Sequence, residues 1–262
     1  MYLAILFFVS LVASSVGAIC GAGGGVIIKP ILDAIELTDV SSASFLSACN
    51  VFVMASYSVL KEIRMPDRKI DIEHVTPLAL GAAVGGVTGK VIFERIKLKL
   101  PFLDMVGAYQ AILLGTIAVG ILVYTIKKNV IQTKQISSKT ICALFGLALG
   151  TMSGFLGIGG GPINLVVLMY FFSMDTKTAA QNSLFIIFIS QLFSLAYTIC
   201  SGNIPEVMMI DVIVMVIGGY IGGTVGRKIG SKIDNNMLEK LFIMLLCTIA
   251  LLSVYNFFNH IC

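Results

Sequence analysis

The sequence has no tryptophan, only two histidines and no paired-cysteine motif. His74 and His260 are far apart, and neither belongs to a metal-ligand spacing such as HExxH. A GxSxG nucleophile motif is also missing. The six cysteines show no CxxC spacing and mostly fall within apolar runs, which is typical of small buried residues. We therefore predict a protein that is not an enzyme and has no catalytic residues, metal or cofactor.

Charge is scarce as well. Charged residues make up 12% of the 262 positions and hydrophobic residues 57%, whereas soluble domains have roughly 25% and 45–50%. This balance indicates an integral, multi-pass protein of the cell membrane. At ~20 residues per span, we expect about eight hydrophobic segments, at residues 2–33, 41–60, 74–93, 104–126, 139–172, 178–200, 207–229 and 237–258.

The first apolar run has no basic residue before Lys29, so we expect a retained span and not a cleaved signal peptide. The net charge of +4 comes from basic residues in short loops. Such residues orient membrane spans, and we expect no nucleic-acid partner.

The chain contains two similar halves. Gly21–Gly25 matches Gly157–Gly161 at an offset of 136 residues, and at that offset Ser47 falls on Ser183. With one more residue of offset, GAAVGGVTGKVIFERI from residue 81 matches GGYIGGTVGRKIGSKI from residue 218. Two blocks at nearly one offset indicate a duplication. We predict an all-α polytopic membrane protein with two homologous four-segment repeats, 1–128 and 139–262, joined by a linker at 129–138.

Two aspartates and a series of spaced glycines have structural explanations. Asp39 and Asp175 each precede a second span, where a carboxylate can cap the unpaired N–H groups of a helix. The third spans carry glycines four residues apart, which lie on one helical face and allow close helix packing. These glycines are Gly81, Gly85, Gly89, Gly218, Gly222, Gly226 and Gly230.

The first segment of each repeat is broken at its glycine cluster. A helix over residues 2–33 would be about 48 Å long at 1.5 Å per residue, against a hydrocarbon core of ~30 Å. Three consecutive glycines also make an unbroken helix improbable. Pro162 follows the second cluster and favours the first turn of a new helix. We expect half-helices that begin at Val26 and Pro162, an arrangement that marks substrate sites in transporters.

The start of a half-helix suits an anion, because it exposes unpaired N–H donors and about half a positive charge. Glycines let the ligand approach the backbone closely. We therefore predict a small anion bound by the two half-helix N-termini between the repeats. The backbone groups concerned are those of Gly23, Gly24, Gly25, Val26, Gly159, Gly160 and Gly161.

Polar side chains near this level are few. Asn164 lies in the first turn after the second break, and the second spans carry Asn50, Gln181, Asn182, Ser183 and Gln191. Such side chains either join helices or contact the ligand. We include Asn164, Asn182, Ser183 and its counterpart Ser47 in the candidate site. Lys29 also belongs to it: its ammonium either extends towards an interface or faces the cavity as a counter-charge.

At these residues the sequence resembles the sulfite exporter TauE/SafE family of membrane permeases, over nearly the whole chain. The resemblance lies in the paired glycine clusters, the segments 43–47 and 179–183, and the glycine-spaced third spans. It implies transport of sulfite, sulfonates or related sulfur-containing anions, commonly as export. It also implies that the glycine clusters with Ser47 and Ser183 form the site. Lys29 departs from the apolar residue usual before the matched proline, which leaves the particular substrate open.

The function expected is that of a permease for a small, sulfur-containing anion. An anion channel, or a carrier for a non-sulfur small organic anion, is the alternative. The expected partners are the lipid bilayer and the anionic substrate, while a coupling proton or other ion and a homo-oligomer stay open. His74 matches Asp211 at the second offset, which is the pair to consider for proton coupling.

Two topologies are compatible with the sequence. All eight segments cross the membrane, or each glycine-broken segment is re-entrant. In the re-entrant arrangement the basic stretches 61–69, 127–139 and 227–240 share one side, and the stretch 90–99 lies opposite. The positive-inside rule favours this arrangement, which would make the halves inverted repeats.

Overall fold

The computed structural model describes residues 2–35, 38–66, 69–99, 103–128, 130–136 and 138–261, apart from the side chains of 97–99, 103–105, 260 and 261. His260 and the outer ends of the two predicted repeats, residues 1 and 262, therefore lie outside this description. The regular structure of the described ranges is helical. The helices are α1 Tyr2–Cys20, α2 Gly25–Ala34, α3 Val40–Ile63, α4 Ile72–Lys99, α5 Leu103–Lys127, α6 Lys139–Leu156, α7 Gly161–Phe171, α8 Thr176–Cys200, α9 Met209–Gly230 and α10 Asn235–Ile261.

Eight of these helices are long and apolar enough to cross a membrane. The remaining two, α2 and α7, have 10 and 11 residues and follow the two glycine clusters. At 1.5 Å per residue each is about half as long as a span requires. The prediction of an all-α protein with eight long apolar segments is confirmed, and each glycine-broken segment is divided into a long helix and a short one.

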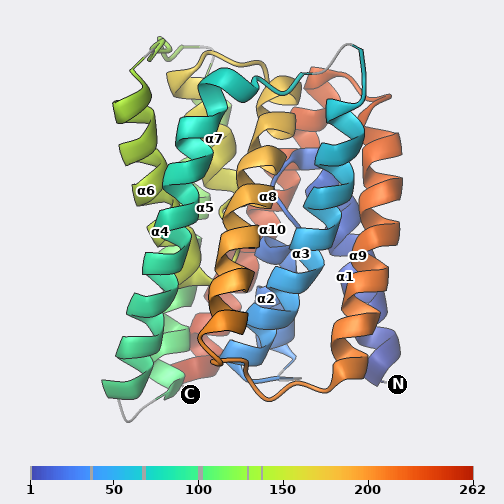
Figure 1. Cartoon of the computed structure of the whole chain (residues 1–262), viewed down its shortest axis with the longest axis vertical. Coiled ribbons are helices and arrows are strands. Elements are labelled where there is room, and N and C mark those ends of the chain that lie inside the picture. The colour runs from blue at the N-terminus through green and yellow to red at the C-terminus, as the bar shows by residue number, and fades with distance from the viewer. Residues whose placement is uncertain are drawn as a thin grey trace.

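The helix bundle has two ends (Figure 1). The upper end in Figure 1 holds the connections after α3, α5, α7 and α9, and the lower end holds both termini with the connections after α2, α4 and α8. Hydrogen bonds agree: the N–H of Lys134 contacts the carbonyl of Tyr170 at the upper end, and Ser42 contacts the carbonyl of Glu206 at the lower end. The upper end is called the basic face below, because its connections and the adjoining helix ends carry Lys61, Arg64, Lys69, Lys128, Lys134, Lys177, Lys228 and Lys232. The lower end is called the termini face.

The short helices return towards the end from which their segment entered. α1 rises from the termini face and α2 descends to it, whereas α6 descends from the basic face and α7 returns there (Figure 1). This is the re-entrant arrangement. Consequently α3, α4 and α5 run opposite to α8, α9 and α10, respectively.

Each predicted repeat packs its helices against helices of the other repeat. The first helix of each half packs along the third span of the other half, as α1 on α9 and α4 on α6. The fourth spans, α5 and α10, pack against each other, and the second spans, α3 and α8, are also in contact. A movement of one half against the other must therefore slide these shared interfaces.

The spaced glycines lie in the contacts between α4 and α6 and between α9 and α1. A Cβ added at Gly85 of α4 would overlap the carbonyl oxygen of Leu147 in α6. One added at Gly222 of α9 would lie 2.5 Å from the carbonyl oxygen of Leu11 in α1. Because the backbones are this close, only a missing side chain allows the packing.

Side-chain hydrogen bonds hold the starts of both second spans, α3 and α8, and the middle of α3. Asp39 is the N-cap of α3 and accepts from the N–H groups of Ser41 and Ser42. Asp175 is the N-cap of α8 and accepts from the N–H of Thr178. In the core, the buried Asn50 amide accepts from Ser14 (2.6 Å) and donates to the carbonyl of Met215 (2.8 Å), which joins α1, α3 and α9.

Candidate substrate site

Each glycine break contains backbone that only glycine adopts without strain. Gly157, the C-cap of α6, has φ 67°, and Gly160, the N-cap of α7, has φ 89°. Pro162 stands at the first turn of α7, where its missing N–H costs nothing. The earlier break also has left-handed residues, at Gly21 and Gly23. Both short helices thus begin inside the bundle, where their first N–H groups have no partner in their own helix.

The two breaks pack directly on each other and on the opposite half. A Cβ at Gly25 would lie 2.8 Å from the carbonyl oxygen of Ile158, and a Cβ at Gly161 would overlap that of Ala22. Ile158 stands 136 residues after Ala22, as Gly161 does after Gly25. The contact of Gly21 with Ala180 and the contact of Gly157 with Ser44 are related by the same offset. The loops therefore meet about a pseudo-two-fold axis with the offset found in the sequence.

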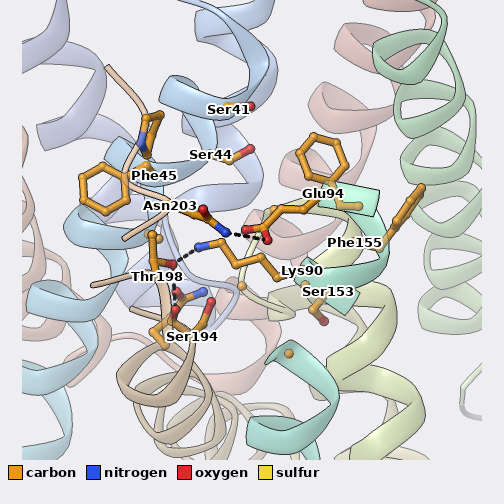
Figure 2. Close-up of a pocket in the computed structure, with 18 of the residues that line it drawn as sticks. Ser41, Ser44, Phe45, Lys90, Glu94, Ser153, Phe155, Ser194, Thr198 and Asn203 are labelled. Atoms are coloured by element: carbon orange, nitrogen blue, oxygen red, sulfur yellow. Dashed lines mark hydrogen bonds between the residues drawn. The ribbon is translucent and has the colours of Figure 1, made fainter. Parts of the chain in front are cut away.

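A cavity of about 620 Å³ reaches the second of these breaks. Its walls come from the first turns of α3, the later half of α4, the end of α6 with the loop that follows, and α8 (Figure 2). Exposed residues of the α8–α9 connection line its mouth, which places the opening at the termini face. The polar residues of the lining are Ser41, Ser44, Lys90, Glu94, Ser153, Ser190, Gln191, Ser194, Thr198 and Asn203.

Lys90 gives the cavity a positive charge. Its ammonium donates to the hydroxyl of Thr198 across the cavity wall (Figure 2). Glu94 lies one helical turn further along α4, and its carboxylate accepts from the Asn203 amide at 3.3 Å. Lys90 is thus held by a neutral hydroxyl and Glu94 by a neutral amide, so the ammonium can take an anionic partner without first breaking an ion pair.

The deep end of the cavity combines glycine backbone with the Gln191 amide, and Asn164 lies nearby beside Gly160. Gly157 and Gly159 line it, and a Cβ at Gly159 would lie 2.6 Å from Nε2 of Gln191. The Oε1 atom of Gln191 and the Oδ1 atom of Asn164 are buried without a hydrogen-bond partner in the described chain. Since buried polar atoms are normally paired, these two oxygens suit a water molecule or another group that donates hydrogen bonds.

The residues predicted for the site occupy different places. Gly159 lines the cavity, whereas the first cluster packs in the core around Val51 of α3, and Val26 is fully buried. Ser47 lies beside Gly25, and Ser183 donates to the carbonyl of Gly161 at 3.4 Å. The two serines therefore stand at the starts of their own half-helices.

Two other predicted residues, Asn182 and Asn164, lie in different places. Asn182 accepts from the N–H of Asp71 and donates to the carbonyls of Lys69 and Thr178, which fixes the chain before α4. Asn164 lies beside Gly160 in the first turn of α7.

Lys29 is buried beside the second glycine break, where its Nζ atom would lie 3.4 Å from a Cβ added at Gly157. Its ammonium donates to Oε1 of Gln110 and to the carbonyl of Leu156, each at 2.6 Å. Leu156 is the last residue of α6, so a cation from one half neutralises the negative end of a helix in the other half. The ammonium therefore faces the end of α6 and the glycine break, and its role as a counter-charge for the anion stays a prediction.

Lys90 and Glu94 were not predicted for the site. Both fall in the glycine-spaced third span, where they look like the basic end of a membrane helix. A signal was present in the match of Lys90 with Arg227 at the second offset, because a cation kept within both third spans is expensive in a membrane. His74 and Asp211 lie apart: the exposed His74 ring pairs with Asp71 at 2.9 Å, while Asp211 is buried and accepts from Tyr2.

Eight apolar spans, two helices broken inside the bundle and a lysine-bearing cavity that reaches the break define a polytopic membrane transport protein. Residues 6–253 match the family "Sulfite exporter TauE/SafE", and the chain belongs to that family. The resemblance seen in the sequence is thereby confirmed. Over 223 residues the chain is 24% identical to the "Probable membrane transporter protein YunE" of Bacillus subtilis (strain 168), covering 78% of this chain and 81% of that protein. No solved structure matches the chain.

Proposed function

We propose that this transporter carries a small, sulfur-containing anion such as sulfite or a sulfonate. The observation that supports the proposal most is the cavity that joins Lys90 to the glycine break at Gly157–Gly159. In this conformation the anion binds between the ammonium and the backbone N–H groups before α7. The family name supports a sulfur oxyanion, and the geometry supports the negative charge.

The energetics favour an anion over a cation. Bringing a charge to mid-membrane costs ~3 kcal/mol or more, while each hydrogen bond between a charged and a neutral group contributes ~1.5–3 kcal/mol. The N–H groups of Gly157 and Ile158 already donate to the carbonyls of Gly154 and Ser153, so the Lys90 ammonium and the later N–H groups of the break would offset the desolvation of a monoanion. A cation can meet the Glu94 carboxylate near the mouth, but deeper in the cavity it would face the Lys90 ammonium and the positive end of α7, which are both repulsive.

The shape of the cavity supports a substrate that can be larger than sulfite. Its volume of about 620 Å³ lies within the range of ~300–1,000 Å³ usual for small-molecule pockets. Phe45, Phe93 and Phe155 line it together with the polar groups. An organic sulfonate would place its oxygens at the glycine break and its apolar part against these rings.

A carrier fits this structure better than a channel. The two breaks touch at Gly25–Ile158 and Gly161–Ala22 without room for a side chain. Beyond them, a buried ion pair joins the halves near the basic face. The cavity thus ends inside the protein. By the positive-inside rule we infer that the basic face is cytoplasmic, so the cavity opens to the other side.

The test is flux into proteoliposomes that contain the purified protein. Sulfite, thiosulfate, sulfate, an alkyl sulfonate and a carboxylate of similar size are compared, with and without a pH gradient. We expect saturable transport and counterflow for at least one sulfur oxyanion, and a strong reduction in Gly159→Leu and Gly160→Leu. Gly120→Leu is the control, because nothing lies within 4 Å of a Cβ added there. Transport of carboxylates alone, or normal flux in both loop variants, would refute the proposal.

A further inference from the structure

The cavity at the termini face has a closed counterpart near the basic face. The second offset, which aligns the third spans, places Lys90 on Arg227. The first offset, which aligns the second spans, places Thr198 on Glu62. The contact between Lys90 and Thr198 in the open cavity thus corresponds to the contact between Arg227 and Glu62 on the opposite side.

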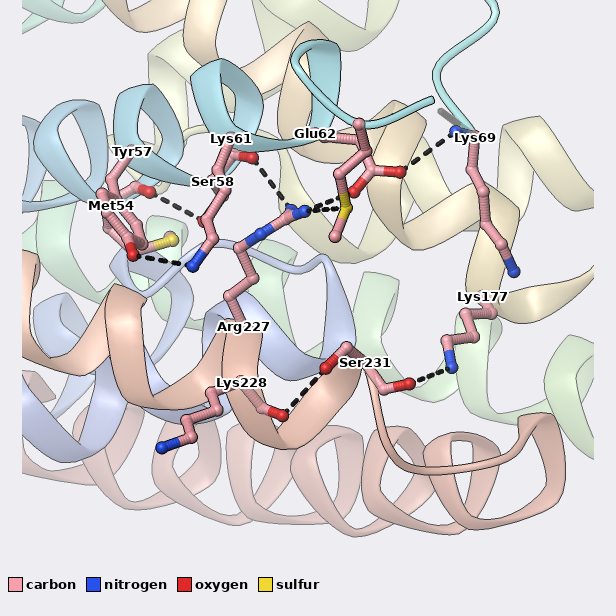
Figure 3. A network of polar contacts seen from close by, with 11 residues as sticks. Met54, Tyr57, Ser58, Lys61, Glu62, Lys69, Lys177, Arg227, Lys228 and Ser231 are labelled. Carbon is pink, nitrogen blue, oxygen red and sulfur yellow. Dashed lines mark hydrogen bonds and ion pairs between the residues drawn. The ribbon is translucent and has the colours of Figure 1, made fainter. Parts of the chain in front are cut away.

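The corresponding contact is an ion pair and it is buried. Nη2 of Arg227 lies 2.6 Å from Oε2 of Glu62, and the two side chains are 8% and 7% exposed. Nη1 of Arg227 donates to the carbonyl of Ser58 at 3.0 Å, and Ser58 is the counterpart of the cavity residue Ser194. Figure 3 shows the guanidinium inserted between α9 and the end of α3.

Glu62 also holds the α3–α4 connection over the basic-face counterpart of the cavity. Its second oxygen, Oε1, accepts from the N–H of Lys69 at 3.0 Å, in the segment that leads into α4 (Figure 3). Asn182 of α8 holds the same segment through the carbonyl of Lys69. One carboxylate therefore ties together α3, α9 and the connection that covers the counterpart of the cavity.

We propose that Arg227 is the substrate-binding cation of the opposite-facing conformation, and that Glu62 occupies it in the conformation seen here. This inference rests on the proposed function and extends it. When the termini-face cavity closes, the Arg227–Glu62 pair separates, the Lys69 segment withdraws, and the first glycine break becomes the floor of a cavity open to the basic face. The anion then replaces the Glu62 carboxylate on the guanidinium.

The physical basis is competition between two anions for one buried cation. A buried guanidinium is costly when it has no partner, so it keeps the carboxylate until another anion is available. Arginine suits this exchange because its planar fork binds carboxylates and oxyanions in the same geometry. Thr198 has no charge to offer Lys90, and the hydrogen bond of the nearby Glu94 carboxylate goes to Asn203. The described residues of the termini side therefore lack an ion pair equivalent to Arg227–Glu62, and the protein rests with that side open.

The experiment measures which side of the protein is open, using cysteine labelling and no substrate. All six native cysteines are replaced, and Ser194→Cys or Ser58→Cys is introduced as a reporter. A membrane-impermeant thiol reagent is added to either side of oriented proteoliposomes. In the parent protein we expect Ser194→Cys to react from the termini face and Ser58→Cys to be protected, since Ser58 is fully buried.

The decisive variant exchanges the two counterparts, Glu62→Thr with Thr198→Glu. We expect labelling of the Ser58 reporter from the basic face to rise at least tenfold, and labelling of the Ser194 reporter to fall by a similar factor. Glu62→Gln alone should move both reporters in the same directions by a smaller factor. Glu239→Gln is the control, because it removes the Lys128–Glu239 ion pair on the same face without touching Arg227.

The outcomes separate this inference from the proposed function. Opposite changes at the two reporters support it, whatever anion is carried. Unchanged labelling in the exchanged variant overturns it, as does a rise at both reporters, which would show loosened packing, or an equal effect of Glu239→Gln. If labelling shifts as expected while no sulfur oxyanion is transported, the substrate class is wrong and the role of Glu62 stands.

Discussion

Replacing Lys90 by glutamine should weaken substrate binding far more than it weakens the fold. Glutamine keeps a donor that can reach the Thr198 hydroxyl, but it removes the ammonium from the cavity. A hydrogen bond to a charged group contributes ~1.5–3 kcal/mol, and 1.4 kcal/mol is a factor of about ten in affinity. We therefore expect the apparent affinity for the anion to fall roughly 10- to 150-fold.

The assay is the concentration dependence of initial uptake by proteoliposomes, together with the melting temperature in detergent. Lys90→Arg should retain most of the affinity, because it keeps the charge. Lys61→Gln is the matched control, since Lys61 is an exposed cation on the basic face. If Lys90→Gln left the affinity within threefold of the parent, or if Lys90→Arg were equally impaired, the ammonium would not bind substrate.

Three further expectations concern the fold that holds the site. In Gly85→Val the new side chain must displace the carbonyl of Leu147. We therefore expect the protein to lose more than about 3 kcal/mol of folding stability or to fail to fold, while Gly120→Val stays stable. Equal melting temperatures of the two variants would contradict the close packing of α4 on α6. Burial raises the pKa of the Asp175 carboxyl, but hydrogen bonds from the start of α8 outweigh it and hold the pKa below 3.8. The ionised carboxylate therefore stabilises the fold at a pH above the pKa of the unfolded chain. The difference in melting temperature between the parent and Asp175→Ala should vanish as the pH falls through the folded pKa. A difference that persists at low pH would contradict the capping role of Asp175. Lys29→Gln should lower the melting temperature and leave the substrate affinity unchanged, because Lys29 caps α6; a selective loss of affinity would instead make it a counter-charge.

Much of the architecture could be predicted from local rules. The glycine clusters break a helix whatever surrounds them, and Pro162 indicates where the helix after the second cluster begins. The four-residue spacing that includes Gly85 puts the glycines on one face, which suffices to predict close packing but not the partner helix. Asp39 and Asp175 were identifiable as caps because capping depends on a few adjacent residues.

The chemistry of the site depended on contacts between distant segments. Lys29 reaches a helix end 127 residues away, and Asn182 binds a connection from the other half, so neither partner is visible in a local pattern. In the sequence, Lys90 resembles a residue of the basic end of a span. Only the structure shows that Thr198 of α8 contacts it and that both line a cavity. The cavity itself reaches one glycine break and not its twin, because a single conformation breaks the symmetry that the duplicated sequence predicts.

The most direct test of the anion site is to locate a bound anion by anomalous diffraction. Selenite has the shape and charge of sulfite and contains a strong anomalous scatterer. In crystals grown with selenite we expect one anomalous peak inside the protein, in contact with the backbone of Gly157–Gly159 and with the Lys90 ammonium. A peak that contacts neither the glycine break nor Lys90, or no internal peak at a concentration that saturates transport, would contradict the site described.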